Sequence, residues 1–290
     1  MLNKKEILNI VNNALREDIK TGDITTNSLI PPNKKAKAKL IAKEEGVIAG
    51  GFVAKLVFQQ LDPKVKWKQF VKDGTYIHKG MTIAEITGSY RALLSGERTA
   101  LNFLQRMSGI ATLTRKFVNK LHGTNTKILD TRKTAPGLRI LDKYAVKTGG
   151  GENHRMGLYD LIMIKDNHIE AVGSITKAVE QIKAKSPKKV KIEVETKNLR
   201  EVKEALNCKV DIIMLDNMSL KNMTKAVKLI NSKALVEASG KMTLDKIKKT
   251  ANTGVDFISV GALTHSVKAL DIGMYIVSKM PNYKKEQQQK

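Results

Sequence analysis

Cysteine is nearly absent from this sequence, because Cys208 is the only one among 290 residues. A single cysteine excludes an intrachain disulfide and a zinc site built from cysteines, and it favours the reducing cytoplasm. Long apolar runs are missing as well, since no stretch approaches the roughly 18 residues that a membrane-spanning helix needs. The amphipathic segment 1–18 is interrupted by asparagines and does not resemble a signal peptide. We therefore expect a soluble, cytoplasmic protein without a membrane partner.

Aromatic residues are also scarce, and acidic residues are outnumbered. Aromatic side chains make up 4% of the chain, which is little for a protein that stacks on the bases of single-stranded nucleic acid. Lysine and arginine total 52 against 28 aspartate and glutamate, for a formal charge of +24. Such an excess attracts polyanions in general, from nucleic acids to phosphorylated small molecules. The lysines are scattered rather than gathered in one stripe, so we expect no nucleic-acid partner.

The pattern of hydrophobic residues along the chain changes near residue 110, from a mixed one to a regularly repeated one. Before it, short alternating segments mix with helical ones, and residues 93–121 predict one long helix. Beyond residue 125, amphipathic helical segments alternate with six short apolar runs: TKILD (126–130), LIMIKD (161–166), VKIEVET (190–196), DIIMLD (211–216), ALVEAS (234–239) and DFISVG (256–261). This order is typical of parallel βα units, and we favour a barrel over an open sheet. The absence of glycine-rich nucleotide fingerprints after these runs counts against a dinucleotide or NTP site.

Each of the six runs ends in polar residues or glycine. The ends carry Asp130 to Lys133, Lys165 to His168, Glu195 with Thr196, Asp216 with Asn217, Ser239 with Gly240, and Gly261 with Ala262. In a βα barrel the carboxyl ends of the strands converge on one face, and that face holds the active site. One such residue alone could be a helix cap, but the whole set predicts a site.

The charged residues near these ends divide by sign. The cationic side consists of Arg132, Lys133, His154, Arg155 and Lys165. Their groups suit carboxylates, because charge-assisted hydrogen bonds contribute about 1.5–3 kcal/mol each. Glu195 and Asp216, on neighbouring runs, form an acidic side that could hold sugar hydroxyls, magnesium or a developing positive charge. Pairing of these two carboxylates with the nearby cations is the plainer alternative.

A glycine turn precedes part of the cationic side. Gly149 to Gly151 permit a tight turn, so His154 and Arg155 can face Lys165 across the rim. Residues 158–164 would form the buried strand that supports this wall. The arrangement predicts a polyanionic substrate.

Two further glycine positions follow the last two runs. Ser239-Gly240 and Gly261-Ala262 each occupy a junction between a strand and a helix. Free backbone N–H groups at such junctions form a phosphate cradle in many barrels. We therefore expect a phosphate at these two turns.

These motifs together resemble the quinolinate phosphoribosyltransferase family, also called carboxylating nicotinate-nucleotide pyrophosphorylase. The resemblance runs through nearly the whole chain. It is carried by EDIKTGDITT (17–26), SGERTALNFLQRMSGIAT (95–112), DTRKTAPGLR (130–139), residues 147–169, IEVET (192–196), DIIMLDNMS (211–219), EASG (237–240) and ISVGALTHS (258–266). Lys241 departs from the family pattern, because a second glycine is usual after Ser239-Gly240.

The resemblance implies a magnesium-dependent enzyme of de novo NAD biosynthesis. Quinolinate and phosphoribosyl pyrophosphate would give nicotinate mononucleotide, pyrophosphate and carbon dioxide. The implied fold is α/β, with an open (β/α) barrel of about six to seven strands at residues 111–265 and an N-terminal α/β sandwich domain at residues 1–110. A C-terminal helix at about residues 266–283 would pack back near the sandwich domain.

The resemblance also assigns roles to individual positions. The catalytic residues would be Lys133, Glu195 and Asp216. Quinolinate would bind to Arg98, Thr131, Arg132, His154, Arg155 and Lys165, with Arg98 reaching into the partner subunit's site of a homodimer. Phosphoribosyl pyrophosphate would bind to Lys133, Glu195, Asp216, Ser239, Gly240, Lys241, Val260, Gly261 and Ala262. Mg²⁺ would be held by Glu195 and Asp216, directly or through water.

Other functions compete with this one. A related transferase could use nicotinate itself, or the chain could be a family homologue from a molybdenum operon. The segments TRKT, HR and IKDNH together favour a dicarboxylate over a monocarboxylate. A nucleic-acid-binding protein would account for the charge of +24, and it predicts basic residues on one face and binding that weakens steeply with salt.

Overall fold

The computed structural model describes residues 3–185 and 189–277, and the contacts of the chain divide it into two compact units. The first unit contains residues 1–113, 136–149 and 267–290, and the second contains residues 114–135 and 150–266. The segment 136–149 thus belongs with the first unit, although it lies inside the expected barrel domain at 111–265. Across the described residues, no helix combines the length and the apolar character needed to cross a membrane.

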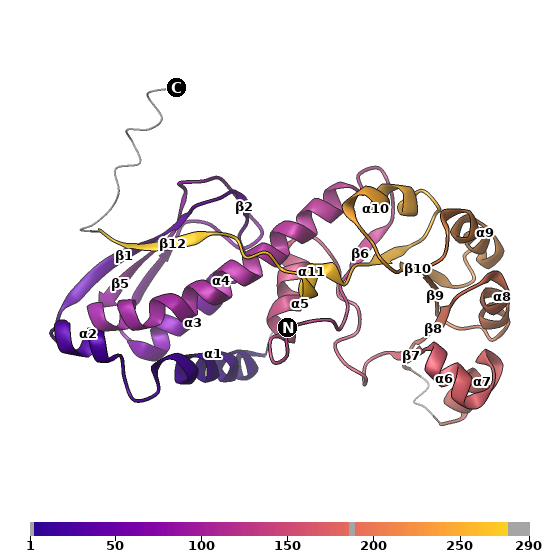
Figure 1. Cartoon of the computed structure of the whole chain (residues 1–290), viewed down its shortest axis with the longest axis horizontal. Helices are drawn as coiled ribbons and strands as arrows, with labels where there is room; N and C mark the ends of the chain where they lie inside the picture. Colours follow the sequence, from indigo (N-terminus) through magenta and orange to yellow (C-terminus); the bar gives the residue numbers. More distant parts are fainter. Residues whose placement is uncertain (1–2, 186–188, 278–290) are drawn as a thin grey trace, which may run out of the picture. The chain divides into compact units, whose positions relative to one another are not determined.

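The first unit is built on a four-stranded antiparallel sheet with the order β12-β1-β5-β3 (Figure 1). Its strands are β1 (Lys35–Ala42), β3 (Lys66–Gln69), β5 (Thr82–Ser89) and β12 (Ile272–Ile276), and a separate pair is formed by β2 (Gly46–Val47) and β4 (Tyr76–Ile77). Its helices are α1 (Lys4–Ile19), α2 (Ile24–Leu29), α3 (Gly51–Leu61) and α5 (Arg139–Thr148). Helix α1 buries Ile7, Val11 and Leu15, because a spacing of four residues puts them on one face.

One long helix, α4 (Tyr90–Asn119), continues from the first unit into the second. It confirms the helix predicted for residues 93–121.

The C-terminal helix expected at about residues 266–283 is wrong for its described part. Residues Ile272–Ile276 form strand β12, which pairs antiparallel with β1, with Leu40 opposite Met274. Short apolar runs fit a strand as well as a helix, and β-branched isoleucines at both ends favour the strand here. Residues 278–283 lie outside the described part of the chain.

The second unit contains a six-stranded parallel sheet with the order β6-β11-β10-β9-β8-β7 (Figure 1). Its strands are β6 (Lys127–Leu129), β7 (Ile162–Ile164), β8 (Ile192–Thr196), β9 (Ile212–Asp216), β10 (Leu235–Ser239) and β11 (Phe257–Ser259). Its helices are α6 (Asp166–Val172), α7 (Ile175–Lys185), α8 (Leu199–Asn207), α9 (Leu220–Ile230), α10 (Leu244–Ala251) and α11 (Ala262–His265). All six predicted strands are therefore confirmed. Because β6 and β7 are neighbours in the chain but lie at opposite edges, the sheet has the strand order of a barrel opened between them, as expected.

Strand β7 is shorter than the buried strand predicted for residues 158–164. Leu158 and Tyr159 are exposed, with 71% and 80% of their surfaces accessible. The carboxylate of Asp160 accepts the N–H groups of Met156 at 2.7 Å and Gly157 at 3.0 Å, so the chain turns here instead of extending. Only Ile162–Ile164 pair with β8.

The register of the sheet aligns the carboxyl ends of its central strands. Asp216 of β9 lies opposite Ser239 of β10, and Thr196 of β8 lies opposite Leu215 of β9. Side chains such as Val194, Ile213 and Ala238 are fully buried. The apolar strands thus hold the polar residues at their ends in a fixed arrangement, which positions the site.

Candidate active site

A cavity of about 310 Å³ lies at the carboxyl ends of the strands of the second unit. Its lining brings together residues from strands β7 to β11 and from loops that include the one after β6 and the one before β7. These are Thr131, Arg132, Lys133, His154, Arg155, Met163, Lys165, Glu195, Met214, Asp216, Glu237, Ser239 and Ser259. Most of the residues predicted for the second unit therefore border one space, as the convergence of strand ends requires. A larger cavity, of about 1170 Å³, lies at the opposite ends of the strands and contains none of the predicted residues.

Two arginines form one wall of the cavity. The guanidinium of Arg155 donates from Nη1 to the carbonyl of Leu161 at 3.1 Å, which fixes its direction. Burial lowers the pKa of Arg155, and the positive charge of Arg132 lowers it further. The two guanidinium groups therefore repel each other, and an anion between them would relieve that repulsion. This wall suits a ligand that carries more than one carboxylate.

A lysine and a glutamate form an ion pair on another wall. Nζ of Lys165, at the end of β7, lies 2.6 Å from Oε2 of Glu195 on β8. The carboxylate of Asp216 accepts a hydrogen bond from the amide of Asn217 at 2.9 Å. Glu195 therefore pairs with a nearby cation, which is the plainer alternative that the sequence left open for it.

A glycine lets Lys133 lie against the start of α11. A Cβ atom on Gly261 would lie 3.1 Å from Cδ of Lys133, and the hydroxyl of Thr264 donates to the carbonyl of Lys133 at 2.8 Å. Ala262 is the first residue of α11. The structure thus places Gly261 and Ala262 beside Lys133, although neither lines the cavity of 310 Å³.

Gly240 allows a second close approach of the backbone. Its φ of +135° is one that other residues rarely adopt, and a Cβ atom there would lie 2.6 Å from Oδ1 of Asn217. Gly240 and Lys241 line a neighbouring cavity of about 480 Å³, and Ser239 borders both cavities. Ser239 therefore connects the site to the turn predicted to bind phosphate.

Like Gly240, Lys241, Gly261 and Ala262, Val260 is not among the residues that line this cavity. Val260 is buried, and its N–H is bonded to the carbonyl of Leu129 at 2.9 Å, so it has no amide proton to offer a phosphate. Arg98 lies on α4 in the first unit, with an exposed side chain. Its role in a partner's site stays a prediction.

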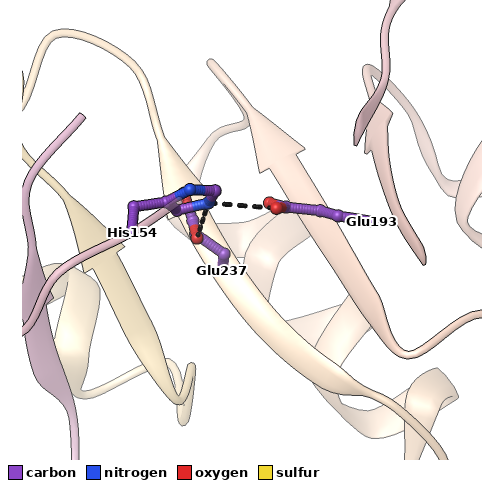
Figure 2. Close-up of side chains that lie close together, drawn as sticks. All are labelled: His154, Glu193 and Glu237. Carbon is purple, nitrogen blue, oxygen red and sulfur yellow. Dashed lines mark ion pairs between the residues drawn. The ribbon is translucent and has the colours of Figure 1, made fainter. Parts of the chain in front are cut away.

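Two residues of the site were missed by the sequence reasoning, namely Glu193 and Glu237. Both are buried, and each points at the ring of His154 (Figure 2), with Nε2 3.0 Å from Glu193 and 3.3 Å from Glu237. The signal was present in the sequence, because side chains two apart share one face of a strand. Glu193 precedes Glu195 by two residues on β8, and Glu237 precedes Ser239 by two on β10.

The protonation of this cluster follows from burial and from one hydrogen bond. Burial opposes charge on His154, but its hydrogen bonds to Glu193 and Glu237 outweigh burial and raise its pKa to about 10. The backbone N–H of Arg155 donates to Nδ1 at 2.8 Å, however, and two N–H groups cannot face each other at that distance. The ring proton therefore lies on Nε2. Burial raises the pKa of Glu193 and the charge of Glu237 raises it further, whereas the hydrogen bond from His154 lowers it.

Glu195 and Asp216 fit the ligands that magnesium prefers. Both offer carboxylate oxygens at the ends of neighbouring strands, and both border the cavity. Magnesium is often bound by one or two carboxylates together with waters and substrate phosphates, so two protein ligands suffice. The donor set is therefore compatible with the predicted metal.

A parallel βα sheet that gathers cations and carboxylates around one cavity at its carboxyl edge defines an enzyme that acts on a small anionic substrate. The sequence matches the family models "Quinolinate phosphoribosyl transferase, N-terminal domain" at residues 23–108 and "Quinolinate phosphoribosyl transferase, C-terminal domain" at residues 110–275. The chain belongs to the quinolinate phosphoribosyltransferase family.

Named relatives agree over nearly the whole chain. It is 46% identical to the probable carboxylating nicotinate-nucleotide pyrophosphorylase of Bacillus subtilis, covering 94% of each protein. It is 47% identical to the chloroplastic carboxylating nicotinate-nucleotide pyrophosphorylase of Oryza sativa subsp. japonica, covering 92% of this chain and 76% of that protein. The crystal structure of NadC from Streptococcus pyogenes matches with a TM-score of 0.91 and 44% identity, covering 96% of this chain and 99% of that one. Human nicotinic acid phosphoribosyltransferase shares only the fold, at 11% identity and a TM-score of 0.59.

Proposed function

We propose that this protein transfers the phosphoribosyl group of phosphoribosyl pyrophosphate to quinolinate. The products are nicotinate mononucleotide, pyrophosphate and carbon dioxide, in de novo NAD biosynthesis. Two relatives named as carboxylating nicotinate-nucleotide pyrophosphorylases, after the reverse of this reaction, are 47% and 46% identical to this protein over most of the chain. The observation that carries the proposal is the single cavity in which Arg132, Arg155 and Lys165 face the carboxylates of Glu195 and Asp216.

Quinolinate binds on the cationic side of this cavity. Its two carboxylates pair with Arg132, Arg155 and Lys165, and the repulsion between the two guanidinium groups falls as the dianion enters. Each charge-assisted hydrogen bond contributes about 1.5–3 kcal/mol. A monocarboxylate would leave part of this wall unpaired, so the site discriminates against nicotinate.

Phosphoribosyl pyrophosphate binds on the acidic side and along the glycine turns. Glu195 and Asp216 accept hydrogen bonds from the ribose hydroxyls, and Lys133 lies near both substrates. The phosphates lie by Ser239, Gly240, Lys241, Gly261 and Ala262. Glu195 and Asp216 would hold magnesium, which would supply positive charge near the departing pyrophosphate.

The residues of the site act by position and charge. As the bond between ribose C1 and pyrophosphate breaks, positive charge grows on the ribose, and the carboxylates of Glu195 and Asp216 stabilise it. Arg132 and Arg155 hold the pyridine nitrogen of quinolinate in line with C1, so that its lone pair forms the new bond. The nitrogen is then quaternary and draws electrons, so the adjacent carboxylate leaves as carbon dioxide and a proton takes its place.

Three parts of this proposal come from the family resemblance. They are the magnesium ion, the homodimer in which Arg98 completes the partner subunit's site, and the cytoplasmic location. The exposed side chain of Arg98 is compatible with a contact between subunits. The single cysteine, Cys208, fits a reducing compartment.

One assay tests the reaction. Purified protein is mixed with quinolinate, phosphoribosyl pyrophosphate and magnesium, and carbon dioxide and nicotinate mononucleotide are followed together. We expect equal amounts of both products, and no mononucleotide when nicotinate replaces quinolinate. Turnover of nicotinate alone would show that the cationic wall does not select a dicarboxylate, and a folded protein that uses neither substrate would refute the proposed function.

A further inference from the structure

Three buried carboxylates lie beneath the segment that carries Arg155. Asp130, directly after β6, accepts the N–H of His154 at 2.9 Å and the side-chain amide of Asn153 at 2.6 Å. Glu193 on β8 and Glu237 on β10 lie at 3.0 Å and 3.3 Å from Nε2 of His154 (Figure 2). Oε1 of each glutamate is buried without a hydrogen-bond partner among the described residues. Such groups are costly to bury, so their place under a substrate cavity calls for a function.

Both ring nitrogens of His154 are already engaged. Nε2 faces the two glutamates, Nδ1 accepts the N–H of Arg155, and only 7% of the side chain is exposed. The ring therefore has no N–H left for a substrate carboxylate. The ring thus connects the buried glutamates, which it contacts through Nε2, to the backbone of Arg155, which it contacts through Nδ1. Arg155 in turn lines the substrate cavity.

We propose that Glu193 and Glu237 are positioning residues for quinolinate: they hold the ring of His154, and His154 in turn holds the backbone of Arg155 so that its guanidinium faces the cavity. This role deepens the proposed function and rests on it. Arg155 needs such support, because its segment follows a glycine turn and lies before the short strand β7. His154 then supports quinolinate binding through Arg155.

His154, Glu193 and Glu237 could instead hold a metal ion, since their ligand atoms lie within 4.8 Å of one another. The hydrogen bond at Nδ1 argues against this. A histidine that binds a metal through Nε2 carries its proton on Nδ1 and donates it to a neighbour. Here Nδ1 accepts a hydrogen bond from the backbone N–H of Arg155 instead. The positive charge of Arg155 also acts on Glu193, which leaves less need for a cation between the carboxylates.

The proposal is tested with E193Q and E237Q, each of which keeps the shape of the side chain and removes its charge. D256N is the matched control, because Asp256 bonds the N–H of Val236 at the other end of β10. We expect each glutamine variant to raise the KM for quinolinate about tenfold or more, with the KM for phosphoribosyl pyrophosphate within about twofold, as the loss of one buried charged contact predicts. D256N should leave both KM values unchanged.

The ring of His154 gives a readout that is independent of turnover. In a ¹⁵N–¹H spectrum of the histidine rings, with His154 assigned by its loss in H154A, we expect an unprotonated Nδ1 and a protonated Nε2. A protonated Nδ1 in the wild type, or a stoichiometric metal that H154A loses, would overturn the proposal even if the variants fail to fold. If the wild type does not bind quinolinate, the proposed function falls. Wild-type binding with an unchanged KM in both glutamine variants overturns only the positioning role.

Discussion

Arg132 combines charge with a shape that a lysine cannot reproduce. Its guanidinium can bind a carboxylate through two parallel hydrogen bonds, whereas an ammonium group acts as a point charge. Arg132 is exposed and follows β6. Arg155 is more deeply buried, and the positive charge of Arg132 contributes to lowering its pKa. Under the proposed function, Arg132 therefore serves mainly to bind the ligand, whereas Arg155 also contributes to the packing around the site.

We expect Arg132→Ala to abolish quinolinate turnover without changing the melting temperature. Arg132→Lys should retain part of the activity, because charge remains while the two-pronged contact is lost, and kcat/KM should fall about tenfold or more. Steady-state kinetics and thermal melting by circular dichroism measure both effects. Arg200→Ala, which removes an exposed arginine on α8, is the control. Near-normal turnover in Arg132→Ala would rule out its assigned role.

The pair of Lys165 and Glu195 should show coupling in a double-mutant cycle. Their charged atoms lie 2.6 Å apart, so each loses its partner when the other is changed. We expect Lys165→Ala and Glu195→Gln each to lower kcat/KM, and the double variant to lose about 0.5–3 kcal/mol less transition-state stabilisation than the two single losses added together. Steady-state kinetics on the four proteins give this number. Additive losses would mean that the pair is broken before the rate-limiting step.

At the scale of secondary-structure elements, Asp62 joins a helix to a strand in the first unit. It follows α3, and its carboxylate accepts the N–H of Ser89, at the end of β5, at 2.8 Å and the N–H of Lys64 at 2.9 Å. The hydrogen bond from Ser89 is the main cause that lowers the pKa of Asp62 below 3.8. This carboxylate is therefore more stable in the folded protein than in the unfolded chain.

Asp62→Asn should destabilise the protein by about 1–3 kcal/mol at neutral pH, because one of the two part-buried N–H groups that it binds loses its acceptor. The folded-state pKa of Asp62 is lowered, so its contribution is present above pH 3.8 and is lost as the pH falls through the folded-state value. The difference in unfolding free energy between wild type and variant should thus be large at about pH 6 and shrink at about pH 3. Urea denaturation at both pH values measures it. A difference that does not change with pH would contradict the assignment.

The helices and strands of the second unit could be predicted from the sequence because they repeat one pattern, a short apolar strand followed by an amphipathic helix. Six apolar runs gave six strands, and the polar residues that follow them gave most of the cavity lining. The errors lie where local pattern and tertiary contact disagree. Residues 272–276 form a strand because the edge of β1 is available to pair with them. Glu193 and Glu237 share a strand face with Glu195 and Ser239, which the sequence does indicate, but their contact with His154 is a tertiary contact that no spacing along the chain reveals.

At the scale of the whole molecule, neither compact unit is one continuous stretch of chain. The first unit takes residues from the beginning, the middle and the end of the sequence, since β12 pairs with β1 and residues 136–149 include α5. A cut at residue 110 would therefore not separate two independent domains. Because β12 comes after strands β6 to β11 in the chain, the sheet of the first unit is complete only when the last part of the chain has joined it. The first unit is therefore expected to lose stability when β12 is removed.

The proposed homodimer makes a prediction for mixed subunits. If Arg98 completes the partner subunit's site, Arg98→Ala and Arg132→Ala are each inactive alone, but a hybrid dimer contains one site with both arginines intact. Random reassortment of equal amounts yields half hybrids, each with one of two sites active, so the mixture should regain about a quarter of the wild-type activity. The two variants are mixed after mild denaturation and refolding, and each is refolded alone as the control. Recovery requires that the two arginines belong to different chains, because a site built within one chain would lack one of them in every combination. A mixture as inactive as its parents would therefore place Arg98 in its own subunit's site, whereas activity of Arg98→Ala alone would place it outside the site.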